Sequence, residues 1–151
     1  MTIDEIAKTL PNGFHDSNLT RLEVNYIASS ARLAFDIDAT PPDVHGRGSS
    51  RIMRTASVDI DGLLYFAIEP PFAQSFAGDY VGDDRRMWIT SDTADFSSLR
   101  FEDDYHQLRL PTALANGAFQ HMFYSSSHNC CLYLAGMSAK FTWTDISDDQ
   151  S

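Results

Sequence analysis

Residues 31–39, Ala-Arg-Leu-Ala-Phe-Asp-Ile-Asp-Ala, place an apolar side chain at every odd position and, apart from Ala34, a charged one at every even position. Because successive side chains of a strand point to opposite faces, this alternation predicts a strand with one buried and one solvated face. Such strands are typical of antiparallel sheets. Residues 20–26 alternate as well, with Tyr26 expected on the apolar face, and the short polar link around Ser29 predicts a hairpin.

The alternation recurs along the rest of the chain, without long helical segments between the strands. It predicts further strands at 52–60, 63–68, 87–90, 99–102, 107–110, 119–124, 130–135 and 139–143, a polar turn region at 91–98 and one helical turn at 112–117. Residues 63–68 are apolar on both faces, which predicts a central strand that is covered on both sides.

One short helix precedes the strands, over residues 2–10. Thr2 and Glu5 have the spacing of a capping box, and Ile3, Ile6 and Leu10 form an apolar stripe. We therefore expect a mainly β protein, an antiparallel β-sandwich or partly open barrel with one short N-terminal helix. The whole chain, 1–151, is expected to be a single domain, with helix and turn at 1–12 and a flexible acidic tail at 147–151.

The charge balance limits the classes of partner. The 151 residues include 11 basic and 21 acidic side chains, a formal net charge of −10. This charge disfavours nucleic acid, whose affinity depends on Lys and Arg, and it favours encounter with a basic protein. Solubility alone is the simpler explanation. No apolar run is long enough for a membrane span and no signal peptide begins the chain, so a cytoplasmic protein that does not bind membranes is expected.

Histidine and cysteine are the obvious candidates for a metal site near 121–131. His121, His128, Cys130 and Cys131 fall on or near one predicted hairpin. Adjacent cysteines of a strand point to opposite faces, however, and cannot readily bind one metal ion together. His121 shares a face with phenylalanines, which indicates a hydrogen-bonded core histidine. We therefore expect no metal site and no cofactor.

Carboxylate pairs offer a second kind of chemistry. Asp36 with Asp38, and Asp59 with Asp61, each share one strand face at a separation that could serve an acid and a base. A solvated polar face explains both pairs equally well, because the alternation itself produces it.

The turn at Gly13-Phe14-His15-Asp16-Ser17 is the most interesting polar cluster. An imidazole can act as an acid or as a base, and the Asp16 carboxylate could fix the tautomer of His15. The structural alternative is that both side chains satisfy backbone groups of the turn between helix and strand. The standard signatures of hydrolases, nucleotide-binding loops and zinc proteases are absent from the sequence.

Residues 10–19, Leu-Pro-Asn-Gly-Phe-His-Asp-Ser-Asn-Leu, followed by an alternating strand, carry a resemblance. They resemble the opening of a loose group of small bacterial proteins of unknown function, which begin with an F-H-D-[AS] turn and a β-hairpin; some members look like immunity proteins. The run 62–71 is similar to a second block in some of those sequences. The resemblance implies a bacterial β-domain with a binding role, and it assigns no catalytic residue.

Two functions follow as hypotheses. The first is a non-catalytic protein-binding module, immunity-like by resemblance, with an acidic face and an aromatic anchor. Its expected contacts are Trp88, Asp103 and Asp104, together with Asp83, Asp84, Glu102 and Tyr105. The alternative is a small enzyme or ligand-binding β-barrel. Its expected site residues are His15, Asp16, Arg51 and Arg54. A homodimer that covers a sheet edge is a third hypothesis.

Overall fold

Two antiparallel sheets and one short helix make up the part of the chain that the computed structural model describes, which is residues 1–44, 51–69, 86–95 and 117–145. The elements are α1 (Ile3–Thr9), β1 (Asn18–Asn25), β2 (Ser30–Asp38), β3 (Met53–Asp61), β4 (Tyr65–Ile68), β5 (Met87–Trp88), β6 (Ser91–Thr93), β7 (Phe119–Ser125), β8 (Cys130–Gly136) and β9 (Ser138–Trp143). The predicted fold class is confirmed.

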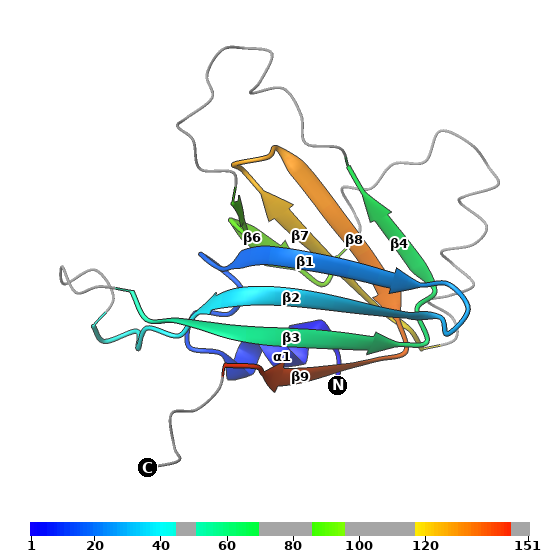
Figure 1. Ribbon diagram of the computed structural model, residues 1–151, viewed down its shortest axis with the longest axis horizontal. Helices are drawn as coiled ribbons and strands as arrows, with labels where there is room; N and C mark the ends of the chain where they lie inside the picture. Colours follow the sequence, from blue (N-terminus) through cyan, green and yellow to red (C-terminus); the bar gives the residue numbers. More distant parts are fainter. Residues whose placement is uncertain (45–50, 70–85, 96–116, 146–151) are drawn as a thin grey trace.

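The sheets lie face to face (Figure 1), and the helix contacts β7 and β9. Sheet A has the strand order β5-β1-β2-β3-β9, and sheet B has the order β4-β8-β7-β6. The predicted hairpin of β1 and β2 is confirmed, with Leu22 opposite Leu33. Gly136 and Met137 carry the chain from β8 in sheet B directly to β9 in sheet A.

The capping box predicted for the helix is present. The Thr2 hydroxyl accepts a hydrogen bond from the Glu5 amide at 3.1 Å, and the Glu5 carboxylate accepts one from the Thr2 amide at 2.8 Å. Ile3 and Ile6 are completely buried, so the apolar stripe packs on the core. The described residues include no helix long and apolar enough to cross a membrane.

Phe14 joins the two sheets at the centre of the core. Its ring is fully buried and lies 5.1 Å from the ring of Phe35 on β2 and 5.2 Å from that of Phe123 on β7. The phenylalanine of the F-H-D turn is therefore a core residue that fixes the turn against both sheets.

Three expectations from the sequence are wrong. The strand expected to be central is an edge strand, because residues 65–68 form the last strand of sheet B, beside β8. Both of its faces are apolar because Phe66 packs on the main core and Ala67 packs outside that core, near Tyr133. Tyr26 is 84% exposed, because the turn begins at Asn25, whose side chain accepts a hydrogen bond from the Ala28 amide.

The third error concerns the polar region at 91–98. Ser91–Thr93 is strand β6, which pairs with β7 although its sequence is polar. The strand lies at the edge of sheet B, where a polar sequence is tolerated. The strands predicted at 99–102 and 107–110, most of the helical turn at 112–117, and the tail at 147–151 fall outside the described residues.

Candidate functional site

The structure brings three of the predicted site residues together. The Asp16 carboxylate lies 3.3 Å from Nδ1 of His15 and 3.2 Å from a guanidinium nitrogen of Arg51. The Asp16 backbone has a φ of 60° and donates a hydrogen bond to the Ile89 carbonyl at 2.9 Å. This backbone bond holds the turn in place, while the imidazole stays on the surface with 60% of its side chain exposed.

Arg54, the fourth residue of that predicted pocket, is engaged elsewhere. Its guanidinium donates two hydrogen bonds to the Asp145 carboxylate, at 2.7 and 3.1 Å, and lies 4.1 Å from the centre of the Trp143 ring. The hydrogen bond from Arg54 lowers the pKa of Asp145 below its ordinary value. Arg54 therefore belongs to the edge formed by β3 and β9.

The residues predicted for an acidic binding face are only partly described. Trp88 is half-buried in β5, with the Arg86 guanidinium 5.8 Å from its ring centre. Asp103 and Asp104 lie outside the described residues, as do Asp83, Asp84, Glu102 and Tyr105.

His121 is a hydrogen-bonded core histidine, as predicted. Its side chain is 1% exposed, its Nε2 lies 3.2 Å from the Asp92 carboxylate, and its ring packs edge-on against Phe123. In the part of the chain that the structure describes, Nδ1 has no hydrogen-bond partner.

The two cysteines are free thiols on β8. Burial raises the pKa of the Cys130 thiol to about 11, and it also raises the pKa of Cys131. Within the described ranges, no group of three or more His, Cys, Asp or Glu residues is placed to hold a metal ion.

A row of alternating charges crosses the outer face of sheet A. Strand register places Glu23 of β1 beside Arg32 of β2, Arg32 beside Asp59 of β3, and Asp59 beside Lys140 of β9. Nε of Arg32 donates a hydrogen bond to Asp59 at 2.5 Å, and Glu23 forms an ion pair with Arg21. Cross-strand pairs of opposite charge stabilise a sheet modestly, so this row also has a structural role.

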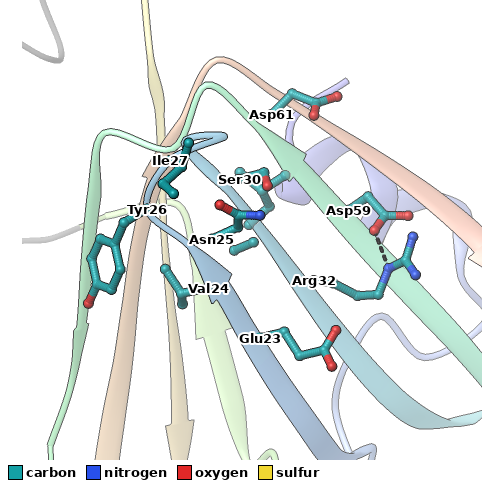
Figure 2. A pocket seen from close by; sticks show the side chains of 11 residues that line it. Glu23, Val24, Asn25, Tyr26, Ile27, Ser30, Arg32, Asp59 and Asp61 are labelled. Atoms are coloured by element: carbon teal, nitrogen blue, oxygen red, sulfur yellow. Dashed lines mark hydrogen bonds and ion pairs between the residues drawn. The ribbon is translucent and has the colours of Figure 1, made fainter.

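A hollow of about 920 Å³ lies at the end of sheet A where the β1–β2 turn projects (Figure 2). Its lining includes three carboxylates and one guanidinium, together with the two apolar side chains of the turn. The lining residues are Glu23, Val24, Asn25, Tyr26, Ile27, Ser30, Ala31, Arg32, Asp59, Ile60 and Asp61. A second hollow of about 400 Å³ shares Glu23 and Arg32 with it and continues over the small side chains of Ala34 and Ser57.

The turn holds two large apolar side chains in solvent. Ile27 is 99% exposed and Tyr26 is 84% exposed. Ser29 has a φ of 48°, and the Asn25 side chain binds the Ala28 amide at 2.9 Å, so the turn has a defined local geometry. Figure 2 shows Tyr26 on the side of the turn away from Asp61, with Ile27 at the crest. We call Glu23, Tyr26, Ile27, Asp59 and Asp61 the tip surface.

The sequence contained only part of the signal for this site. The alternation of apolar and polar residues placed Asp59 and Asp61 on one face of a strand. Their shared position was equally well explained by an ordinary solvated face. The exposure of Tyr26 and Ile27 and the register that aligns Arg32 with Asp59 appear only in the structure.

Comparisons of the chain with protein families, with curated proteins and with solved structures give no match. The resemblance to small bacterial, partly immunity-like proteins therefore stays a prediction.

Proposed function

We propose that the protein is a non-catalytic binding module that recognises another protein through the tip surface. The observation that carries this proposal is the exposure of Tyr26 and Ile27 beside a hollow of about 920 Å³. Large apolar side chains next to a polar rim are typical of protein interfaces, whose energy comes mostly from a few such anchors.

The chemistry of the hollow supports recognition. The described residues of its lining contain no imidazole and no thiol, and the Asp59 carboxylate is already bonded to Arg32. The net charge of −10 adds long-range attraction for a basic partner. The resemblance to small bacterial proteins implies a more specific version of this proposal. In that version the protein has an immunity-like role, and it would bind and block a basic bacterial enzyme.

A capture experiment tests the proposal. The protein, tagged at its carboxyl end, is incubated with native lysate at low and high salt, and bound proteins are identified by mass spectrometry. The double variant Tyr26→Ser/Ile27→Ser removes the apolar part of the tip surface. The matched control is Leu64→Ser/Ile68→Ser, which removes two other apolar side chains that are 46% and 45% exposed.

We expect a specific partner to be captured by the wild type and the control and to be lost by the tip variant. Circular dichroism checks that each variant is folded. Equal capture by the tip variant would refute the use of this surface. An empty capture by the folded wild type would contradict the binding function itself.

The His15, Asp16 and Arg51 cluster supports the alternative function. An exposed imidazole next to a carboxylate that a guanidinium holds in place is an arrangement suited to a small ligand or to acid–base chemistry. Thermal-shift screening of the wild type against His15→Ala tests it. A compound that raises the melting temperature of the wild type alone would favour this alternative.

A further inference from the structure

We propose that the tip surface binds its partner through one basic side chain, which pairs with Asp61, while Ile27 and Tyr26 contact apolar residues around that basic group. This inference rests on the proposed function, and it adds the chemistry of the partner: an arginine or lysine set in an apolar surface of a protein. Three observations support it.

The first observation is that Asp61 is the carboxylate of the tip surface that has no counter-ion among the described residues. Glu23 pairs with Arg21, and Asp59 pairs with Arg32. No hydrogen bond or ion pair joins the Asp61 side chain to any other described residue, including Lys140, which lies diagonally across from it on β9. A partner cation at Asp61 would therefore form a new pair without breaking an existing one.

The second observation is the space around Asp61. Its neighbours across the sheet are Ser30 on β2 and Ser138 on β9, both with small side chains. Figure 2 shows Ser30 between the turn and Asp61, with no large side chain of the labelled set in that gap. A long basic side chain could enter beside these hydroxyl groups and reach the carboxylate. The guanidinium of arginine suits this position best, because it can bind a carboxylate through two parallel hydrogen bonds.

The third observation is the position of the apolar side chains relative to Asp61. Ile27 lies at the crest of the turn, and Tyr26 lies on its other side (Figure 2). A partner that contacts all three side chains must extend around the turn, with its basic residue on the β3 side and an apolar depression over Ile27. Apolar contacts around an ion pair exclude water and strengthen the electrostatic attraction.

A peptide titration tests this chemistry without knowledge of the natural partner. The probe is a capped pentapeptide, Gly-Leu-Arg-Leu-Gly, and its matched control carries citrulline, which has a similar shape and no charge, in place of arginine. Binding to the full-length ¹⁵N-labelled protein is followed by amide chemical shifts, at peptide concentrations up to about 10 mM because a single short contact binds weakly.

We expect the arginine peptide to shift the amides of residues 26–30 and 59–61, and the citrulline peptide to have a severalfold weaker effect. Asp61→Asn should weaken the arginine peptide about threefold, the range of a solvent-accessible ion pair. Asp43→Asn is the control variant, since Asp43 is an exposed carboxylate beyond the opposite end of β2. Equal shifts with both peptides, no shifts at the highest concentration, or no effect of Asp61→Asn would each overturn the inference.

The capture experiment separates this inference from the proposed function. If Tyr26→Ser/Ile27→Ser loses the natural partner, and Asp61→Asn binds it as tightly as the wild type in titrations at low and at high salt, the binding function stands and the role of Asp61 is refuted. If Asp61→Asn binds the captured partner about threefold more weakly than the wild type, and Asp43→Asn binds it as tightly, both are supported.

Discussion

Replacement of Phe14 by leucine tests whether the F-H-D turn is held by its aromatic residue. The substitution keeps an apolar side chain but removes two ring contacts, at 5.1 Å to Phe35 and 5.2 Å to Phe123. Each such contact contributes about 0.5–1.5 kcal/mol beyond area burial, and the small void left by the shorter side chain adds roughly 0.5 kcal/mol. We expect Phe14→Leu to lower the free energy of unfolding by about 1.5–3.5 kcal/mol.

The assay is equilibrium unfolding in urea, with the denaturant slope compared between variants so that a change in midpoint reports stability. Phe141→Leu is the matched control, because Phe141 is half-buried and, among the described residues, has one ring contact, with Trp143 at 4.9 Å. It should cost about 1 kcal/mol or less. If Phe14→Leu costs no more than Phe141→Leu, the argument that Phe14 joins the two sheets is wrong.

Three further predictions concern buried groups and one turn. Asp92→Ala leaves the buried imidazole of His121 without a hydrogen-bond partner and should lower the free energy of unfolding by about 1–3 kcal/mol in urea titrations; an unchanged midpoint would refute this. Burial raises the pKa of the Cys130 thiol from 9.0 to about 11, so the unfolded chain loses this proton at a lower pH than the folded chain. Between pH 9 and 11 the free energy of unfolding of the wild type should therefore fall by on the order of 2 kcal/mol more than that of Cys130→Ala. Parallel pH curves of the two proteins would contradict this prediction. Gly62→Ala forces a side chain at a φ of 61° and places Cβ 2.7 Å from Cγ of Met137, which should cost about 1–3 kcal/mol by the same assay; a neutral effect would mean that this turn adjusts freely.

Local patterns predicted most of the described fold. The capping box at Thr2 and the period-two alternation of β2, β7, β8 and β9 depend on neighbours in the sequence, so the sequence alone identifies them. The position of β4 at a sheet edge depends on which distant strands pair, and an apolar run of six residues carries no such information. Tyr26 was misplaced because alternation continues in the sequence past the point where Asn25 begins the turn.

The candidate site was predictable only in fragments. The alternation placed Asp59 and Asp61 on one face, and the composition indicated an acidic protein. Pairing between strands, which the turn and the core determine together, sets the register that brings Arg32 beside Asp59. The same register leaves Asp61 without a cation among the described residues. His15 and Asp16 were found together because they are adjacent in the chain, whereas the partner of Arg54, Asp145, lies far along it.

The crossing from β8 to β9 has a consequence for biosynthesis. During translation β1, β2 and β3 emerge first and can pair as neighbours, but the outer edge of β3 remains uncovered until β9 has left the ribosome. β9 also contacts the N-terminal residue, because the Ala139 amide donates a hydrogen bond to the Met1 carbonyl at 2.7 Å. A nascent chain that stalls before Ser138 would therefore present an unpaired strand edge, which is a template for aggregation. Chains released just short of β9 should accordingly depend on chaperones more than the full-length chain does.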